Sequence, residues 1–342
     1  MKIGVLLSGG VDSTVAAYLM KEQGCETIAI TMVNGEYNSL EAARDSAAEL
    51  NLTHQVIDLE KLFHEKVVDY FCRSYAQGET PNPCTVCNRY VKFGAILDYA
   101  KSLGCEKIAT GHYAKLAYDP SSKRYQLSKG NDPKKDQSYF LFDLSQEQLS
   151  YTVFPLGSYT KTEVKTIAGQ QGFRAQNYNE SQEICFIRDD YRQFLEGRIL
   201  SPAGAIIDTS GNYLGAHQGI AHYTVGQRKG LGVSWKYPLY VLALDPVNNQ
   251  VIAGGESELY RRVLWSGDNN FVSVPPWDKP VLAKARIRYR ASEAQAWLIP
   301  DKDMIKVEFC EPQRAITKGQ AVVYYDGDVV LGGGRIMFCE AD

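Results

Sequence analysis

Three cysteines stand where they could carry sulfur, redox or metal chemistry. Cys84 and Cys87 form a C-x-x-C pair that follows two prolines and precedes an amphipathic helical pattern, and Cys185 lies in a short apolar run. Both members of the pair are therefore expected in or near the first turn of a helix. Positive potential at a helix N-terminus, together with Arg89 and Lys92, favours thiolate formation. A thiolate at this place could act as a nucleophile or as a metal ligand.

The C-x-x-C pair alone is compatible with three kinds of chemistry. A zinc site normally needs a second C-x-x-C or a histidine pair, and neither follows at zinc-finger spacing. A thioredoxin-like redox pair would open the helix after an early strand of a different topology. Sulfur transfer, with or without an iron–sulfur cluster, is the interpretation that the spacing favours. Taken alone, Cys185 would be read as a buried core cysteine.

A second motif predicts a phosphate-binding loop. The segment Leu7-Ser8-Gly9-Gly10-Val11-Asp12-Ser13 follows the first predicted strand and opens a helix. Its glycines let backbone N–H groups approach an anion, its serines add hydroxyl donors, and the helix N-terminus supplies positive potential. It contains neither the dinucleotide fingerprint nor the Lys-Ser/Thr ending of a Walker A loop. The alternative is a glycine-rich turn without a ligand, and the position of six motif residues favours nucleotide binding.

Basic residues that could contact RNA phosphates occur in the second half of the chain. Arg286, Arg288 and Arg290 alternate on a predicted strand at residues 281–290, which would place all three on one face. The alternative is a solvated edge strand that basic residues protect from aggregation. The net charge of −3 argues against a broadly electrostatic nucleic-acid binder, but not against local basic patches.

The elements that must position these residues begin with strand–helix alternation. Strands are predicted at residues 2–7, 27–33, 53–57 and 107–110, and helices at 11–23, 39–50, 59–75 and 85–103. This alternation implies a mainly parallel sheet covered on both faces. Ligands bind at the carboxyl ends of such strands, where Ser8–Ser13, Met32 and Gly111 stand.

The second half of the chain is rich in short β-type runs. Strands are predicted at residues 240–244, 281–290, 305–309, 321–325 and 333–338, as in a small barrel or sandwich. Because 342 residues exceed one ordinary core, we predict a catalytic domain at 1–195, a central linker domain at 196–257 and a C-terminal β-barrel at 258–342. The sequence contains neither a signal peptide nor an apolar run near the roughly 20 residues of a membrane span, so a cytoplasmic enzyme without a membrane partner is expected.

Several motifs occur in one order along the chain. These are the phosphate loop, T-P-N-P-x-x-x-C-N, T-G-H-Y-A, K-D-Q-S-Y-F-L, S-Q-E-I-C-F-I and G-Q-R-K-G-L-G. As a set they resemble the tRNA-specific 2-thiouridylase family (MnmA type), whose phosphate loop is that of the ATP pyrophosphatase (PP-loop) superfamily. The resemblance runs from residue 1 to the end and is weakest at 36–72 and 255–279. It implies a doubly wound α/β domain of the adenine nucleotide α-hydrolase type, a small central domain and an RNA-clamping β-barrel.

The resemblance also implies a reaction. ATP with magnesium would adenylate O2 of the wobble uridine, and Asp12 would help to hold the metal. Cys185 would receive a persulfide from a sulfur carrier or cysteine desulfurase, and Cys87 would attack it to form a Cys87–Cys185 disulfide that a reductant resets. The residues that would line the ATP site are Leu7, Ser8, Gly9, Gly10, Val11, Asp12, Ser13, Thr14, Met32 and Gly111.

RNA contacts are implied at further positions. Contacts to tRNA are expected from His112, Lys135, Asp136, Gln137, Arg288, Tyr289 and Gln320. Asn82, Pro83 and residue 84 match the stretch that contacts the target base. Many relatives have aspartate at 84 as general acid/base, whereas this chain has Cys84, and a thiol cannot be assumed to do a carboxylate's proton transfer.

Two sets of alternatives stay open at this point. Cys84, Cys87 and Cys185 could hold an iron–sulfur cluster with one open iron, instead of working as a persulfide relay. The chain could also be a pyrophosphatase that acts on a small molecule with ammonia, or a non-catalytic tRNA-binding paralog. The first rival predicts ATP turnover without tRNA, and the second predicts tRNA retention without a thiolated nucleoside.

Overall fold

A five-stranded parallel sheet forms the N-terminal part of the protein. The computed structural model describes residues 1–35, 40–177, 184–187 and 190–340. The sheet has the order β3-β2-β1-β4-β7, and every neighbouring pair is parallel. Its strands are β1 (Lys2–Leu6), β2 (Glu26–Val33), β3 (Thr53–Asp58), β4 (Lys107–Ala109) and β7 (Thr152–Val153).

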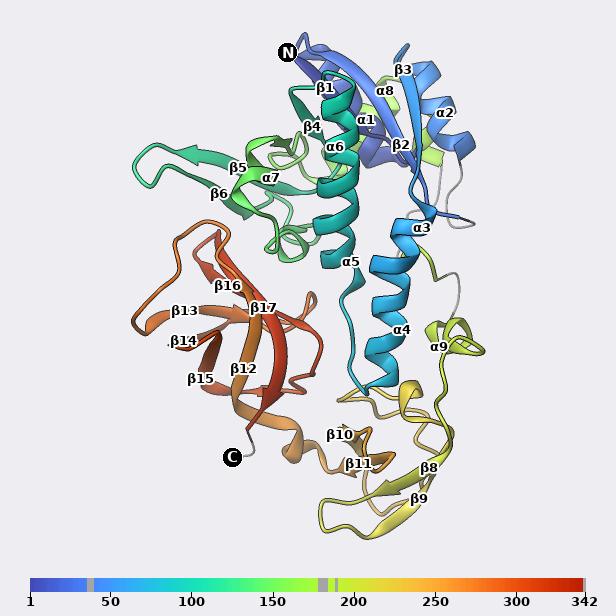
Figure 1. The fold of residues 1–342 in the computed structure, drawn as a ribbon, viewed down its shortest axis with the longest axis vertical. Coiled ribbons are helices and arrows are strands. Elements are labelled where there is room, and N and C mark those ends of the chain that lie inside the picture. The colour runs from blue at the N-terminus through green and yellow to red at the C-terminus, as the bar shows by residue number, and fades with distance from the viewer. Residues whose placement is uncertain (36–39, 178–183, 188–189, 341–342) are drawn as a thin grey trace.

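Helices cover both faces of this sheet (Figure 1). Ile3, Val5 and Ala29 pack on one face with α1 (Val11–Glu22), α2 (Leu40–Glu49) and α8 (Lys161–Gln170). On the other face, Ile28 and Ile108 pack with α6 (Ile96–Ser102). The alternation of apolar side chains along the strands therefore serves two cores. The predicted doubly wound parallel sheet is confirmed.

Two long helices contain π-helical segments in their middle. The first consists of α3 (Glu60–Phe63), the π segment η1 (His64–Val68) and α4 (Asp69–Ala76). The second consists of α5 (Pro83–Val86), the π segment η2 (Cys87–Ala95) and α6. π-helical segments are rare and are frequently found at functional sites. The sequence pattern predicts both helices, at 59–75 and 85–103, but not their change of winding.

The C-terminal part is a closed six-stranded antiparallel barrel (Figure 1, orange and red). Its strands are β12 (Tyr260–Asn270), β13 (Val281–Arg286), β14 (Ala294–Asp301), β15 (Met304–Arg314), β16 (Ala321–Asp326) and β17 (Val329–Cys339). The order is β12-β15-β14-β13-β16-β17, and pairing of β12 with β17 closes the barrel. The prediction of a C-terminal barrel is confirmed.

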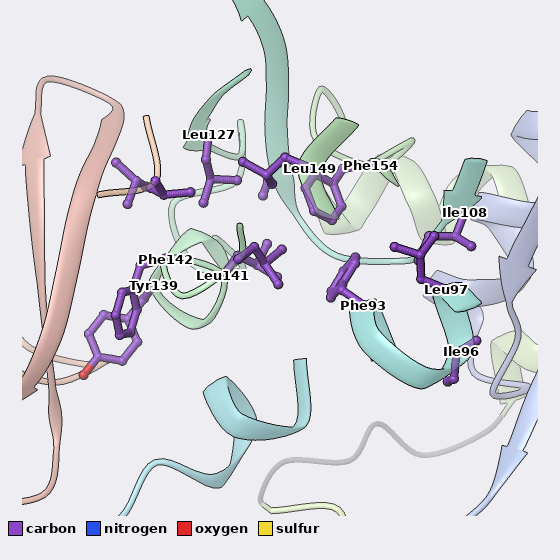
Figure 2. Packing of buried hydrophobic residues seen from close by; sticks show 14 of the residues in the cluster. Phe93, Ile96, Leu97, Ile108, Leu127, Tyr139, Leu141, Phe142, Leu149 and Phe154 are labelled. Carbon is purple, nitrogen blue, oxygen red and sulfur yellow. The ribbon is translucent and has the colours of Figure 1, made fainter. Parts of the chain in front are cut away.

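The barrel is joined to the parallel sheet by a shared core (Figure 2). The hairpin of β5 (Ala114–Asp119) and β6 (Arg124–Lys129) extends from the N-terminal part and pairs with β17. Phe93 and Phe154 lie near the sheet, and Tyr139 lies against the barrel, where its hydroxyl donates to the Ala321 carbonyl at 2.8 Å. Apolar packing therefore continues from one part to the other.

The remaining elements are short. A separate four-stranded sheet of order β10-β11-β8-β9 consists of β8 (Gly204–Ile207), β9 (Tyr213–His217), β10 (Tyr240–Asp245) and β11 (Gln250–Gly254). The other helices are η3 (Ser138–Phe140), α7 (Gln146–Ser150), η4 (Arg174–Asn177), α9 (Tyr191–Leu195), η5 (Ile220–His222) and η6 (Glu256–Leu259). Within the described residues, none of the helices is long and apolar enough to span a bilayer.

One predicted strand is too long. The strand expected at 281–290 ends at Arg286, and the chain then turns, with the Ala291 amide donating to the Arg288 carbonyl at 3.0 Å. Arg288 and Arg290 therefore do not share a strand face with Arg286, and the prediction of three aligned arginines is wrong. Arg286 is also neutralised internally, because it pairs with Glu293 at 3.1 Å and with Asp136 at 3.8 Å.

Candidate active site at the carboxyl edge of the parallel sheet

The loop between β1 and α1 is held by its own hydroxyl groups. Ser13 Oγ lies 2.9 Å from the Gly10 carbonyl, and it accepts a hydrogen bond from the Ser8 amide at 3.2 Å. Thr14 Oγ1 lies 3.0 Å from the same Gly10 carbonyl. Leu7 and Val11 point into the core, so they can offer a ligand only their backbone groups. Hydroxyl groups within the segment therefore fix the backbone of the predicted phosphate loop.

Asp12 in this loop is already paired. Lys161 Nζ lies 2.8 Å from both carboxylate oxygens, and the Tyr113 hydroxyl donates to Oδ1 at 2.6 Å. Lys161 is the first residue of α8, whose N-terminus is fixed by a capping box between Thr160 and Glu163. No sequence motif pointed to Lys161, since it lies 149 residues from Asp12. Tyr113 does lie in the T-G-H-Y-A motif, and this motif could have identified it as a residue of the site.

Gly111 and Met32 are the other residues predicted to line the nucleotide site. A Cβ atom on Gly111 would come within 2.9 Å of the Asp12 backbone, so only glycine allows this approach of β4 to the loop. Met32, near the end of β2, packs against the sheet core and also against the apolar cluster that contains Cys87. The carboxyl edge of the sheet therefore brings together the loop, Gly111 and Met32, as ligand sites in parallel sheets require.

The three candidate cysteines converge although they are far apart in the chain. Cys87 is the first residue of η2 and packs in one buried cluster with Ile184 and Phe186, which flank Cys185. The charges of Cys185 and Cys84 are close enough to raise the pKa of Cys87. Each of the eight cysteines, all of which the structure describes, is a free thiol.

The cysteines are not activated in the way that their helix position suggested. Burial raises the pKa of Cys87 to about 12 and also raises the pKa of Cys84, whereas Cys185 is exposed at the surface and its pKa is raised by the protein atoms that surround it. Arg89 does not help, because its guanidinium is paired with Asp143 at 2.8 Å. Lys92 alone of the two predicted cations acts on the sulfurs and lowers the pKa of all three thiols. The expected thiolate stabilisation by Arg89 is wrong, and burial outweighs the effect of Lys92.

The π-helical winding of η2 explains why Lys92 reaches the cysteines. In an α-helix a residue five positions after Cys87 would lie about 140° away around the axis. In a π-helix the hydrogen bond runs from residue i to i+5, as from the Ile96 amide to the Val91 carbonyl, and each residue turns less. Lys92 is thereby rotated back toward the side of Cys87.

His112 connects the cysteines to the nucleotide loop. It follows Gly111, its Nδ1 lies 2.8 Å from Thr110 Oγ1, and its ring lies 5.8 Å from that of Phe93. Burial, reinforced by the charge of Lys92, holds the pKa of His112 well below its usual value, so the ring is neutral at physiological pH. Gly111 packs against Asp12, and the neighbouring His112 packs against Phe93 and feels the charge of Lys92, so these residues link the loop to the cysteine helix.

The residues expected to contact tRNA differ in exposure and in whether their side chains already bind other residues of the protein. Asp136 is 4 % exposed and its carboxylate accepts from the Gly130 and Ser138 amides, so its side chain is engaged internally. Gln137 Oε1 accepts from the Tyr113 amide at 3.1 Å. Lys135, Arg288 and Tyr289 are partly exposed, and Tyr289 packs on Phe140 with ring centroids 4.5 Å apart.

Two base-contacting candidates are close to the cysteines in the fold. Asn82 and Pro83 are buried, and Pro83 is the first residue of α5, directly before Cys84. The Asn82 carbonyl accepts from Thr85 Oγ1 at 2.8 Å. Gln320, from the barrel, lies against Thr80 and Pro81 of the same segment.

The three cysteines lie near one another but do not form a metal-binding group in this structure. Across the part of the chain that the structure describes, no three histidine, cysteine, aspartate or glutamate side chains come together as a metal-binding group. Cys84, Cys87 and Cys185 are among these described residues, so the structure gives the cluster alternative no support beyond their proximity.

Comparison with known proteins gives consistent matches along the whole chain. Family models described as the tRNA methyl transferase HUP domain, the tRNA methyl transferase PRC-barrel domain and the aminomethyltransferase beta-barrel domain match residues 1–189, 192–255 and 261–336. A solved 4-thiouridine synthetase–RNA complex with bound ATP covers 52% of this chain and 41% of its own, at 20% identity and a TM-score of 0.34, which is too distant to carry an argument.

Two proteins named tRNA-specific 2-thiouridylase MnmA are much more similar. That of Syntrophomonas wolfei subsp. wolfei is 48% identical over 98% of this chain and 100% of its own length. That of Moorella thermoacetica is 48% identical over 97% of this chain and 98% of its own. With this identity over nearly the full length of both relatives, the chain belongs to the tRNA-specific 2-thiouridylase family.

Proposed function

We propose that this protein uses ATP to replace O2 of a tRNA uridine with sulfur, giving 2-thiouridine at the wobble position. The convergence of Cys87 and Cys185 at the helix that carries Lys92, with His112 and Gly111 between this helix and the β1–α1 loop, is the observation that carries the proposal. In this proposal the loop binds ATP, which activates the uridine, and the cysteines carry the sulfur that replaces O2. Because the proposed substrate is tRNA, we assign the reaction to the cytoplasm.

The first step is adenylation of the uridine. O2 of the base attacks the α-phosphorus of ATP, a bond to O2 forms, and pyrophosphate leaves. The loop residues Ser8 to Ser13 bind the phosphates, and Lys161 can move from Asp12 to the leaving pyrophosphate. A magnesium ion, which prefers oxygen ligands, fits the partly exposed Asp12 carboxylate and would supply charge neutralisation there.

The second step transfers sulfur, and we propose a persulfide relay for it. The terminal sulfur of a Cys185 persulfide, delivered by a sulfur carrier or cysteine desulfurase, attacks C2 of the base and AMP leaves. The Cys87 thiolate then attacks the Cys185 sulfur, the S–S bond to the base sulfur breaks, and 2-thiouridine is released with a Cys87–Cys185 disulfide. A dithiol reductant then reduces the Cys87–Cys185 disulfide to two thiols and is itself oxidised to a disulfide. No step requires an iron–sulfur cluster.

In this step Lys92 is proposed to stabilise the negative charge on sulfur. Every sulfur species in the relay, the persulfide and the attacking thiolate, carries negative charge, and the Lys92 ammonium acts on all three cysteines. Cys84 stands where many relatives are expected to have an acid/base aspartate. Its raised pKa keeps it as a thiol, so it can donate a proton but is a poor base.

The RNA is proposed to bind across the junction of the sheet and the barrel. Lys135, Arg288 and Tyr289 offer partly exposed charge and ring surface to the backbone, while Asn82, Pro83, His112 and Gln320 stand nearer to the target base. The division into a catalytic domain (1–195), a central linker (196–257) and a barrel (258–342) belongs to this proposal.

Reconstitution with purified components tests the function. The protein would be incubated with unmodified tRNA, ATP and a persulfide donor, and the tRNA would be digested and its nucleosides measured by mass spectrometry. We expect 2-thiouridine that requires both ATP and Cys185. Turnover of ATP without tRNA, unaffected by Cys87→Ser and Cys185→Ser, would instead identify a small-molecule pyrophosphatase. Tight tRNA binding without any thiolated product would identify a non-catalytic paralog.

A further inference from the structure

The segment that leads to Cys84 is attached to the barrel through its backbone. The Thr80 amide donates to the Lys318 carbonyl at 2.9 Å. Gln320 Nε2 lies 3.1 Å from the carbonyls of both Thr80 and Pro81. These contacts join residues about 240 positions apart in the chain. One amide side chain of the barrel therefore spans two consecutive peptide groups of the segment.

A buried carboxylate strengthens the same contact. Glu79 is 4 % exposed, and it pairs with Lys318 Nζ at 3.3 Å and with the Arg335 guanidinium. Gly319 has a φ of +89°, and a Cβ there would come within 2.9 Å of Glu79 Cβ and 3.0 Å of the Thr80 carbonyl. The barrel backbone can approach the segment this closely only because residue 319 is glycine.

The attachment continues directly into the cysteine helix. Pro81 and Pro83 restrict the backbone of the segment, and Pro83 begins α5, in which Cys84 lies. Further along, Asn88 Nδ2 donates to the Phe140 carbonyl at 2.9 Å, in the region that packs against the barrel through Tyr139. A displacement of the barrel edge would therefore move Asn82, Pro83 and Cys84 with it.

We propose that Glu79, Lys318, Gln320 and Arg335, together named the barrel clamp, position the base-contacting segment for catalysis. The barrel would then bind the RNA and also fix the position of the segment that contacts the uridine, so that both have the same frame of reference. This inference rests on the proposed function, and it deepens it by giving the barrel a positioning role besides RNA binding. Arg335 is a positioning residue, since it acts through Glu79, whereas Gln320 both holds Thr80 and Pro81 and stands among the residues proposed to lie near the base.

Two variants and a matched control test the clamp. Gln320→Leu removes the amide that spans Thr80 and Pro81, and Arg335→Met removes a partner of Glu79. Arg335→Lys keeps the charge and should restore part of the effect. Arg262→Met is the control, because Arg262 is also a barrel arginine on a β-strand, but its guanidinium donates to the Cys310 carbonyl instead.

The first readout does not depend on activity. Hydrogen exchange of the intact protein would be followed by mass spectrometry in the peptide at 79–87, where the Thr80 amide reports directly on the clamp. We expect exchange to be about tenfold faster or more in Gln320→Leu and Arg335→Met than in the parent and in Arg262→Met. Unchanged exchange in both clamp variants would overturn the inference.

The second readout is single-turnover thiolation together with tRNA affinity. We expect the rate at saturating tRNA to fall by about tenfold to a hundredfold in both clamp variants, since small misplacements of reacting groups have effects of this size. A loss confined to tRNA affinity, with a normal saturated rate, would also overturn the positioning role. If the parent protein itself leaves tRNA unmodified, the proposed function fails, whereas the exchange result still decides whether the clamp holds the segment.

Discussion

Lys161 Nζ lies 2.8 Å from each carboxylate oxygen of Asp12. The two residues belong to the first turns of α8 and of α1, and Asp12 is part of the predicted phosphate loop. A carboxylate for magnesium and an ammonium for pyrophosphate are the two charges that adenylation needs at this place. Their pairing neutralises both charges in this structure.

Replacement of Lys161 should affect adenylation more than tRNA binding. In Lys161→Met we expect tRNA-dependent pyrophosphate release to fall by about a hundredfold or more, because a cation near the leaving group is lost. Lys165→Met, on the exposed side of the same helix, serves as the control. Pyrophosphate release by Lys161→Met at the rate of Lys165→Met would contradict the role of Lys161.

The two relay cysteines should separate sulfur transfer from adenylation. Cys87→Ser and Cys185→Ser remove thiols that act only after the base is activated, so AMP formation with tRNA should stay within about threefold while 2-thiouridine is lost. Cys310→Ser, at an exposed cysteine of the barrel, should behave like the parent protein. Measuring AMP and thiolated nucleoside in the same reaction checks this. Full thiolation by Cys87→Ser would exclude the disulfide-forming step.

Cys84 distinguishes the relay from a cluster. We expect protein purified without oxygen to contain no stoichiometric iron or sulfide, and Cys84→Ala to retain thiolation within about tenfold, the size of a modest acid/base contribution. Iron and sulfide analysis of the parent protein and of Cys84→Ala makes the measurement. One cluster for each chain, lost together with activity in Cys84→Ala, would replace the relay with a cluster-bound sulfide.

The thiol of Cys87 should react slowly and with a steep pH dependence. Its pKa, raised by burial to about 12, predicts alkylation that increases about tenfold for each pH unit from 7 to 10, since only the thiolate reacts. Lys92→Met should slow the reaction further at every pH, because the ammonium favours the anion. Iodoacetamide labelling of Cys87, quantified by peptide mass spectrometry, tests both effects. A plateau below pH 9 would mean that Cys87 is already ionised.

The sequence predicts the parallel sheet, the barrel and the phosphate loop because each depends on local patterns. Short apolar runs predict the strands, and the glycines after Ser8 predict the turn that begins the loop. The Lys161–Asp12 pair and the Glu79–Arg335 contact have no such signal, because they depend on tertiary packing between distant segments. The winding of η2 is also not visible in its apolar periodicity, although it decides where Lys92 lies.

The wrong predictions about the site concern which basic side chains are available to the cysteines and to RNA. From spacing alone, Arg89 and Lys92 both follow Cys87 closely, and only the fold reveals that Asp143 takes up the Arg89 charge. The arginines after β13 similarly fit a strand pattern until the turn at Arg288 breaks it. Burial of Cys87, which sets its pKa, comes from the helix that carries Phe63 and Phe71 together with Phe186, nearly a hundred residues away in the chain.

The most direct test of the central claim uses cells. Total tRNA from a strain that lacks this gene would be digested and its nucleosides measured by mass spectrometry, with the parent gene or the Cys185→Ser gene returned on a plasmid. We predict that 2-thiouridine derivatives disappear in the deletion strain, return with the parent gene and do not return with Cys185→Ser. A nucleoside profile that the deletion leaves unchanged would contradict the account.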